Sequence, residues 1–467
     1  MALQSDVVIV GGGPAGITAA ATLARAGVPV LVLEGGRHAG AENWSGAVYF
    51  CENLVAEDAF GPEILRHAPV ERPVYRRGLL ATDGVGLVGL APEGAEIFHH
   101  CYTVQRPLFD RFLAEAAEDL GVTVLSGCHA TALIRDAGRV VGVMTDQGAV
   151  YADVVFLAEG DASQLVTREG YEEVDRPHFA QGVKAVLDIP PAEIERRFHL
   201  SPNQGAAYEI LIRNPLVGGR RTRLNAGGFL YTNRDTLALG YVLPLDAAHE
   251  HWRGDHHRLL EWLRSLPSLT PYLVDAKLIG FGTKLIRIGG TREMPRLVDH
   301  GLAIGGAATG IGVDFPCPNF TGPATFMGLA FARAVIAARA AGADLDEAAL
   351  SERYAEPVRA SSYYRDAHWL RRWPDYVEST TVFFSTPIDW TLRAGTLLAD
   401  RSQSWWSRIW GLGRVFEELV QPKRAGQVVK GVWRPVIALG LGRATLRGLT
   451  LRHPLQWLTN LLPGGQD

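Results

Sequence analysis

A glycine-rich turn close to the start of the chain constrains its fold more than any other feature. Residues 11–16 read G-G-G-P-A-G, a G-x-G-x-x-G pattern. A strand predicted at Asp6–Val10 precedes it, and an Ala/Leu-rich helix predicted at Ile17–Ala26 follows it. Val28–Leu33 is a second β-branched strand. Strand, helix and strand in this order predict a parallel βαβ unit, and therefore an α/β chain.

The residue types in this turn suit a backbone that binds phosphate. Gly11 permits the tight turn, Gly13 lets a pyrophosphate approach the backbone at the helix N-terminus, and Gly16 allows close packing of helix on strand. Glu34 follows Gly16 by 18 residues, at the end of the second strand. A carboxylate at that place accepts hydrogen bonds from ribose hydroxyls. These features together predict a dinucleotide-binding site.

Two later segments indicate which dinucleotide is bound. Val154–Gly160 is a predicted strand that ends in Ala-Glu-Gly. Leu302–Gly312 begins with a short apolar strand, and Gly322 and an Ala-rich helix predicted over Thr325–Ala341 follow it. Each segment alone is equally typical of a buried strand that ends at a glycine turn. The glycine-rich turn followed by these two segments, in this order, is typical of FAD enzymes. In such enzymes the chain returns to the cofactor, and a second helix N-terminus faces it.

The composition limits the class of protein. At about 150 residues per domain, a chain of 467 residues is expected to form two or three domains. A hydrophobic content of 47% and a net charge of −4 exclude a disordered chain and argue against a nucleic-acid binder. The four cysteines form no C-x-x-C pair, so we predict neither a disulfide framework nor a metal or iron–sulfur site. A reduced, cytoplasmic compartment fits this cysteine usage best.

The order of the predicted elements divides the chain into four parts. A helix is predicted from Pro107 to Gly121 and strands from there to residue 158, whereas residues 40–77 are expected to be irregular. The strand-rich region 182–282 contains an amphipathic helix at His256–Leu266. The expected parts are residues 1–175, the first part of a cofactor-binding domain in which 45–100 contribute to the substrate side; 176–282, an inserted mixed-sheet substrate domain; 283–345, the closing part of the cofactor-binding domain; and 346–467, a helical extension.

Further segments occur in an order that resembles one family of flavoproteins. These segments are Gly40–Ala47 (G-A-E-N-W-S-G-A), Tyr102–Arg106 followed by Phe109-Asp110, Gly228–Asn233, Leu239-Gly240, Gly289-Gly290 and Ile304–Ala308. From about residue 5 to about residue 340, the chain resembles the electron transfer flavoprotein–quinone oxidoreductases. Within that family it is most similar to the FixC-type branch that lacks the iron–sulfur domain. The family lies in the superfamily of geranylgeranyl reductases and other FAD-dependent oxidoreductases.

The resemblance implies a glutathione-reductase-type, Rossmann-like FAD-binding fold, with FAD as the cofactor. Gly306 stands where many related flavoproteins have an aspartate, which some quinone oxidoreductases of this family also lack. Residues 45–47 and 289–290 are expected to line the flavin ring, and an apolar substrate pocket is expected between the FAD domain and the insert. The expected cofactor-binding residues are Gly11, Gly13, Pro14, Ala15, Gly16, Glu34, Gly35, Ser45, Gly46, Ala47, Arg106, Ala158, Glu159, Gly160, Gly305, Gly306 and Gly322. No metal ligand and no catalytic acid or base is identified.

The resemblance also implies a reaction. Electrons would pass from an electron-transfer flavoprotein or a ferredoxin-like donor through FAD to a membrane quinone. A second hypothesis is a reductase of isoprenoid or lipid double bonds, similar to geranylgeranyl reductases, or another oxidoreductase on a lipophilic substrate. A third is a non-catalytic, membrane-attached flavoprotein that serves as a scaffold.

The last hundred residues differ in composition from the rest of the chain. From Arg365 onward, the chain carries eight of its 11 tryptophans and a net charge of +6, although the whole chain has −4. Residues 405–419 and 432–462 place aromatic and aliphatic side chains at helical spacing among arginines. This pattern favours an amphipathic surface on the cytoplasmic face of the cell membrane, without a spanning helix. The alternative is that the apolar stripe packs on the FAD domain or in a dimer interface.

Overall fold

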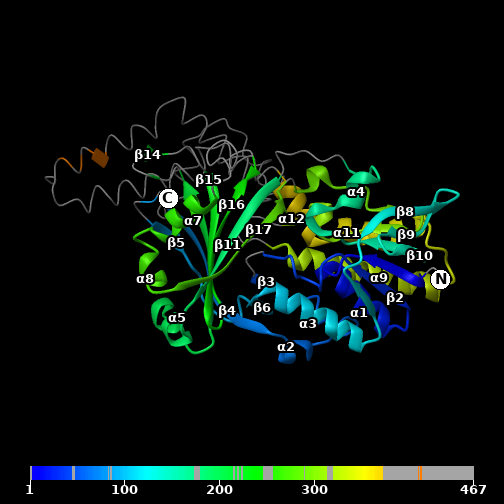
Figure 1. The fold of residues 1–467 in the computed structure, drawn as a ribbon, viewed down its shortest axis with the longest axis horizontal. Coiled ribbons are helices and arrows are strands. Elements are labelled where there is room, and N and C mark those ends of the chain that lie inside the picture. The colour runs from blue at the N-terminus through cyan, green and yellow to red at the C-terminus, as the bar shows by residue number, and fades with distance from the viewer. Residues whose placement is uncertain are drawn as a thin grey trace, which may run out of the picture.

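The computed structural model consists of two lobes, each built on one large β-sheet (Figure 1). The two lobes together contain the N-terminal turn, the strand-rich region and the first helices of the C-terminal part. The structure describes residues 3–44, 48–82, 84, 87–172, 179–213, 216–217, 220–221, 225–245, 256–288, 290–312, 319–371, 407, 409 and 411–412.

The sheet of the first lobe is centred on the strand before the glycine-rich turn. β1 (Leu3–Val10) pairs in parallel with β2 (Val30–Glu34) on one side and with β10 (Gly148–Leu157) on the other. The last four residues of β1 are buried, as expected for a central parallel strand covered on both faces. The sheet order is β18-β19-β10-β1-β2-β7, and β9 pairs with both β10 and β8. The other strands are β7 (Thr123–Ser126), β8 (Ala130–Asp136), β9 (Arg139–Thr145), β18 (Val298–Asp299) and β19 (Leu302–Ile304).

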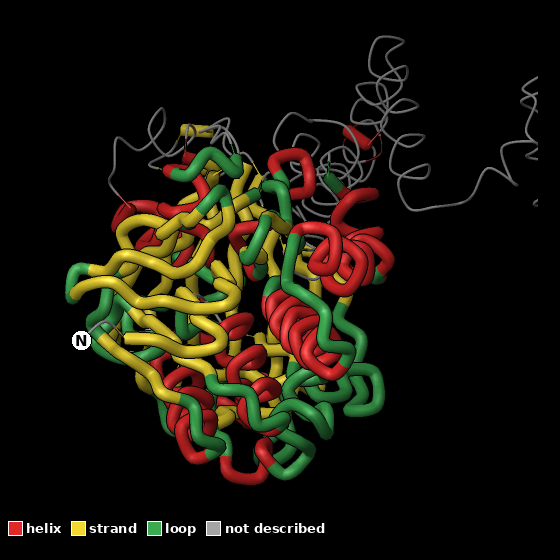
Figure 2. The backbone as a smooth tube through the Cα atoms, turned by 90° about the vertical axis from the view of Figure 1, so that its right-hand side faces the viewer, coloured by secondary structure: helices red, strands yellow, loops and turns green. Residues whose placement is uncertain are grey.

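Three helices pack together beside this sheet (Figure 1), and the side view shows helices next to the strands (Figure 2). α1 (Pro14–Arg25) lies between α3 (Arg106–Asp119) and α9 (Thr321–Ala340). The approach of α9 to α1 depends on Gly328, because a Cβ there would lie 2.1 Å from the backbone oxygen of Ala15. Among the described residues, α9 alone is long and apolar enough to cross a bilayer, and 67% of its apolar window is buried inside the protein. Shorter helices are α2 (Ile64–His67), α4 (Gln164–Arg168), α10 (Glu347–Leu350), η5 (Ser351–Ala355), α11 (Glu356–Ala360) and α12 (Ser362–Leu370), with single turns η1 (Gly160–Ala162), η3 (Gly290–Glu293) and η4 (Gly306–Thr309).

The second lobe carries a mixed sheet with the order β17-β11-β16-β15-β12-β4-β6-β3. Its helices α5, α7 and α8 pack on one face and bury the side chains that point to that face, for example Tyr208 and Ile210 of β12 (Figure 1). Successive residues of a strand point to opposite faces, so Glu209 and Leu211 lie on the face toward the first lobe. The elements are β3 (Val48–Phe50), β4 (Val70–Thr82), β5 (Leu87–Leu90), β6 (Cys101–Val104), β11 (Phe179–Asp188), α5 (Pro191–Phe198), β12 (Gly205–Arg213), β13 (Leu216–Val217), β14 (Arg220–Arg221), β15 (Asn225–Thr232), β16 (Thr236–Pro244), α7 (His256–Arg264), α8 (Thr270–Leu273) and β17 (Lys277–Arg287).

The expectation that residues 40–77 are irregular is wrong. β3 and most of β4 lie in this range, and both belong to the second sheet. The sequence of β4 does not have the pattern of a strand. Its buried positions include Arg72 and Arg77, and Pro73 stands near its start. Arg72 contacts Glu195 and Arg77 contacts Glu209, so each buried guanidinium has a carboxylate partner that sequence periodicity does not reveal.

Other predicted elements agree with the structure in type and differ at their ends. The helix predicted at His256–Leu266 is α7, whereas the predicted helix of the βαβ unit begins three residues earlier, at Pro14. The strand-rich region runs to Arg287 because β17 is longer than predicted. These sheets and helices confirm the predicted Rossmann-like α/β architecture with an added mixed sheet. In the extension, residues 347–360 and 362–370 are helical. The segments 405–419 and 432–462 lie outside the described residues except for 407, 409 and 411–412.

Candidate functional site

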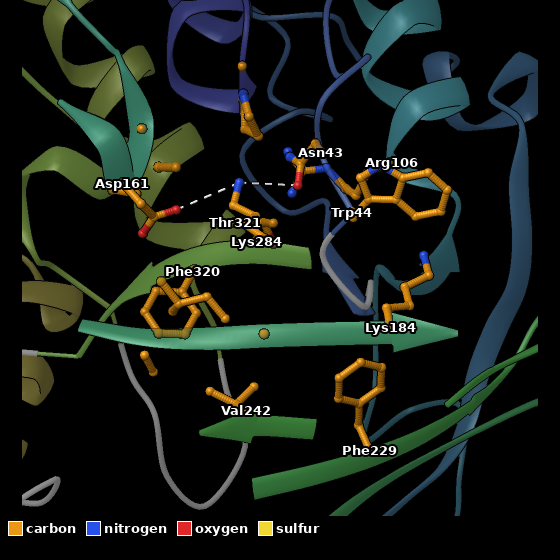
Figure 3. Close-up of a pocket in the computed structure, with 18 of the residues that line it drawn as sticks. Asn43, Trp44, Arg106, Asp161, Lys184, Phe229, Val242, Lys284, Phe320 and Thr321 are labelled. Carbon is orange, nitrogen blue, oxygen red and sulfur yellow. Dashed lines mark hydrogen bonds and ion pairs between the residues drawn. The ribbon is translucent and has the colours of Figure 1, made fainter. Parts of the chain in front are cut away.

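A cavity of about 560 Å³ lies between the two sheets. Its walls are the glycine-rich turn before α1, the segments that follow β10 and β19, and the face of the second sheet that the helices leave open. Figure 3 shows labelled side chains from the segment after β10, from the start of α9 and from the second sheet around the same space. Of the predicted cofactor-binding residues, those that line the cavity are Gly11, Gly13, Pro14, Ala15, Glu34, Arg106, Ala158, Glu159, Gly160 and Gly306.

The three glycines that define the G-x-G-x-x-G pattern, Gly11, Gly13 and Gly16, have different surroundings. Gly11 has a φ of +106°, and a Cβ there would lie 2.4 Å from the backbone oxygen of Ala158. A Cβ on Gly16 would lie 2.0 Å from the backbone oxygen of Gly11. At Gly13, by contrast, a Cβ would meet no described atom within 4 Å. Gly11 and Gly16 are therefore needed for packing of the chain on itself, whereas the space beside Gly13 is open to a ligand.

The open space beside Gly13 faces the N-terminus of α1. The N–H groups of the first turn of a helix have no acceptor within that helix and carry partial positive charge. Pro14 occupies the first position, where its missing N–H costs nothing. This arrangement of open backbone and helix N-terminus fits the pyrophosphate of a dinucleotide.

Glu34 is fixed beside this turn by its own backbone contacts. The N–H of Gly12 donates to Glu34 Oε2 at 2.8 Å, and the N–H of Gly36 donates to Oε1 at 2.7 Å. A carboxylate offers about four acceptor positions, so both oxygens retain capacity for ribose hydroxyls. Gly35 points elsewhere, since a Cβ on it would lie 3.1 Å from the ring of His129.

Glu159 was expected to bind the cofactor, but its carboxylate hydrogen-bonds to the backbone of its own chain. Its carboxylate accepts the N–H groups of Leu165 and Val166 at 3.1 Å and so stabilises the start of α4. Burial raises the pKa of this carboxyl, and the two backbone hydrogen bonds oppose the rise. Glu159 lines the cavity beside Ala158 and Gly160, while its carboxylate is already occupied in holding α4.

The remaining predicted residues are distributed around the cavity or lie outside the described part. Gly306, with a φ of +74°, begins η4 and would place a Cβ 3.2 Å from that of Ala15. Gly305 packs under it, where a Cβ would lie 2.4 Å from the ring of Phe156. Gly322 is in the first turn of α9, next to the cavity residue Thr321. Ser45, Gly46, Ala47 and Gly289 lie outside the described residues.

Three cationic side chains line one part of the cavity. Arg106 is buried and makes a bidentate ion pair with Asp110, with both N···O distances at 2.7 Å. Lys184 extends from β11 toward Trp44 and Arg106 (Figure 3), and burial, with Arg106 nearby, lowers its pKa to about 8. Lys284 of β17 donates to Asn43 Oδ1 at 3.1 Å and lies 3.7 Å from Asp161 Oδ2. Arg106 and Lys284 therefore each have a carboxylate partner that also lines the cavity, and Lys184 adds a third cationic group near Arg106.

Sequence reasoning identified Arg106 and missed both lysines. Each lysine stands in a mainly apolar strand, in F-A-Q-G-V-K-A-V-L-D for Lys184 and in F-G-T-K-L-I-R for Lys284. A charged residue within such a strand was the sequence feature that could have pointed to the cavity. Trp44 belongs to the segment Gly40–Ala47 that carries the family resemblance, and it lies against β17, where a Cβ on Gly282 would be 2.1 Å from the indole.

The part of the cavity formed by the second sheet is mainly apolar. Phe229, Val242 and Ile286 line it from three strands, and Phe320 lines it from the segment before α9 (Figure 3). One carboxylate, Glu209, interrupts this wall and was not identified from the sequence. The cavity thus combines a polar, glycine-built part with an apolar part.

Comparison with known proteins agrees with this geometry. Residues 6–167 match the model of the family described as FAD dependent oxidoreductase. The chain is 33% identical over 393 residues to the probable electron transfer flavoprotein-quinone oxidoreductase YdiS of Escherichia coli K12, covering 82% of this chain and 87% of YdiS. It is 32% identical over 389 residues to FixC of the same strain, with the same coverage.

Solved structures share the fold at lower identity. A geranylgeranyl bacteriochlorophyll reductase-like protein from Thermoplasma acidophilum superimposes with a TM-score of 0.64 at 17% identity, covering 90% of this chain and 99% of that one. The halogenase CndH superimposes with a TM-score of 0.58 at 20% identity, covering 79% of this chain and 83% of that one. The sequence relatives extend over most of both chains, and the cavity has the features of a dinucleotide site. The chain therefore belongs to the family of FixC and the electron transfer flavoprotein–quinone oxidoreductases, and it is an FAD-dependent oxidoreductase.

Proposed function

We propose that this protein takes electrons from an electron-transfer flavoprotein or a ferredoxin-like donor and passes them through FAD to a quinone of the cell membrane. The observation that carries the proposal is the single cavity that runs from the glycine-rich turn to the apolar face of the second sheet. A cofactor held at the first part would present its reactive end to a lipophilic molecule at the second. The names of the sequence relatives support the same assignment of donor and acceptor.

The residues present fit FAD, and we assign their roles as follows. The first turn of α1 would hold the pyrophosphate, Glu34 the ribose hydroxyls, and the backbone at Gly306 the middle of the cofactor. When bound, FAD accepts electrons from one partner and releases them to another. Arg106 and Lys184 would offset the negative charge that accompanies reduction, because both lie buried where charge is weakly screened.

An apolar wall supports a lipophilic electron acceptor. Phe229, Val242 and Ile286 offer no hydrogen-bonding side chain, so an apolar ring gains free energy by displacing water from them. A quinone has to be taken from lipid, and the basic, tryptophan-rich extension provides charge and aromatic groups that suit anionic headgroups. We therefore propose a cytoplasmic protein bound peripherally to the inner face of the cell membrane.

The apolar wall also favours a second candidate, a reductase of isoprenoid or lipid double bonds. The similarity in fold to the Thermoplasma acidophilum protein is compatible with it. The two candidates differ in what reoxidises the reduced protein. Anaerobic stopped-flow mixing with a short-chain quinone should reoxidise the flavin rapidly, whereas a polyprenyl lipid should leave it reduced. Turnover of the polyprenyl lipid without any reaction with quinone would establish the second candidate instead.

A non-catalytic scaffold is the third candidate, and the colour of the protein tests it. The first two candidates require a yellow protein that binds FAD in a ratio of about one to one. A colourless protein that cannot be reconstituted with FAD would contradict both and favour the scaffold.

A further inference from the structure

The most unusual side chain in the apolar part of the cavity is Glu209, at the middle of β12. It is 7% exposed and lines the cavity from the second sheet. In register, it lies between Leu79 of β4 and Phe229 of β15, both of which line the same cavity. A carboxyl group in such a wall costs several kcal/mol to bury unless it has partners or is protonated. Its hydrogen-bond partners therefore decide whether this position is already satisfied within the protein.

One oxygen of this carboxyl is fully engaged, and the other is not. Arg77 donates to Glu209 Oε1 from Nη2 at 2.8 Å and from Nε at 3.1 Å, and the hydroxyl of Tyr231 lies 3.5 Å from the same oxygen. Oε2 is buried and has no hydrogen-bond partner among the described residues. Buried polar atoms are rarely left in this state, so a group that enters the cavity is the natural partner of Oε2.

The surroundings of Glu209 balance two opposing effects on its proton. Burial raises the pKa of the carboxyl above its usual range. Arg77 on β4 and, more weakly, Tyr231 on β15 act in the opposite direction because they stabilise the charged form. The guanidinium of Arg77 is itself held 5.2 Å over the ring of Phe50, so it stays in place when the carboxyl changes its charge. A carboxylic acid of this kind holds a proton and yields it to a suitable acceptor.

We propose that Glu209 is a catalytic acid that hydrogen-bonds to a carbonyl oxygen of the quinone and protonates it as electrons arrive. The proposal rests on the quinone oxidoreductase function proposed above. A quinone becomes a quinol by gaining two electrons and two protons. Both electrons and one proton come from the anionic reduced cofactor, which returns to its oxidised form. The second proton leaves Glu209 Oε2 as the new O–H bond forms on the quinone, and water later restores it.

The contacts with Arg77 also stabilise the negative charge that Glu209 carries after it has given up its proton. After the transfer, Glu209 is a carboxylate that retains both N–H donors of Arg77 on Oε1. Charge-assisted contacts of this type are about twice as strong as hydrogen bonds between neutral groups. Arg77 is thus a positioning residue that keeps the conjugate base in a buried place.

The test compares two isosteric variants of the FAD-loaded, full-length protein. E209Q removes the proton donor and keeps an oxygen for Arg77. E195Q is the matched control, because Glu195 also pairs with a buried arginine, Arg72, at 3.1 Å and is not part of the cavity wall. Each reduced protein is mixed anaerobically with a short-chain quinone and, separately, with ferricyanide, which accepts electrons without a proton.

We expect E209Q to be reoxidised by quinone about 100-fold more slowly than the wild type, and by ferricyanide at the same rate. E195Q should react with both as the wild type does. Equal slowing by both oxidants, or no slowing of the quinone reaction, would overturn the role of Glu209. If the wild type itself fails to react with quinone while ferricyanide reoxidises it, the proposed function fails first, and the acid role falls with it.

A spectroscopic measurement tests the proposal without relying on turnover. Infrared difference spectra of the oxidised, FAD-loaded protein with and without bound quinone should show a carboxylic acid C=O band that E195Q retains and E209Q lacks. E209D keeps an acid in case the amide variant folds poorly, and it should shift the band rather than abolish it. A wild-type spectrum without any protonated carboxyl change, or a band that survives in E209Q, would contradict the proposal.

Discussion

Substitution of Gly13 by alanine should weaken the binding of the cofactor without weakening the fold. Gly13 has φ and ψ of −77° and −175°, which alanine adopts without strain, and the added Cβ meets no described atom within 4 Å. A Gly-to-Ala change at a compatible position stabilises a protein by about 0.4–1 kcal/mol, because the unfolded chain loses freedom. We therefore expect G13A to fold at least as well as the wild type.

The same methyl group would stand where the pyrophosphate approaches the backbone. Loss of one hydrogen bond to a charged group costs about 1.5–3 kcal/mol, which corresponds to a rise of about 10- to 150-fold in the Kd for FAD. The assay is a fluorescence titration of apoprotein with FAD, combined with urea unfolding of each apoprotein.

Gly27 provides the matched control for this prediction. It ends α1 at a φ of +71°, and a Cβ there would also meet no described atom within 4 Å. G27A should lose about 1 kcal/mol of stability from backbone strain and bind FAD as the wild type does. The reasoning is refuted if G13A binds FAD with unchanged affinity, or if G13A unfolds more easily than G27A.

Three further predictions address the charges of the cavity and the extension. R106L should lower the free energy of unfolding of the apoprotein by about 3–5 kcal/mol, because it leaves the buried carboxylate of Asp110 unpaired; a loss below about 1 kcal/mol in urea unfolding would contradict this. Lys184 has a folded-state pKa of about 8, below its unfolded value of 10.5. The unfolded state therefore binds more protons between these pH values, and the wild type should gain about 3 kcal/mol of stability relative to K184M as the pH rises through this window; a constant difference between the two proteins would show that Lys184 is not buried as described. The full-length protein should float with anionic lipid vesicles at low salt and be released at high salt, and replacement of Arg401 and Arg408 by glutamate should abolish flotation; flotation that ignores both changes would exclude the electrostatic contact.

Sequence patterns predicted the elements whose side chains repeat in a simple way. The run V-V-I-V in β1, the glycines before α1 and Glu34 at the end of β2 are local signals, and each reports one strand or turn. The order of such segments was enough to predict the fold and to predict that the cofactor is FAD.

The features that sequence patterns missed depend on partners from distant parts of the chain. Arg77 of β4 is buried because Glu209, 132 residues later, lies beside it on the neighbouring strand β12. Lys184 of β11 extends toward Arg106, the first residue of α3, although 78 residues separate them in the sequence (Figure 3). Local periodicity assigns such residues to the surface, since it does not contain the partner that makes burial favourable.

The most direct test of the account follows electrons through the whole chain of partners. A reduced electron-transfer flavoprotein is added anaerobically to the FAD-loaded protein and to vesicles that contain quinone, and the formation of quinol is recorded. We predict quinol formation that requires added protein, that falls in G13A with the loss of FAD, and that falls in E209Q with FAD still bound. Reduction of the bound FAD without quinol formation, while ferricyanide still reoxidises it, would contradict the proposed function.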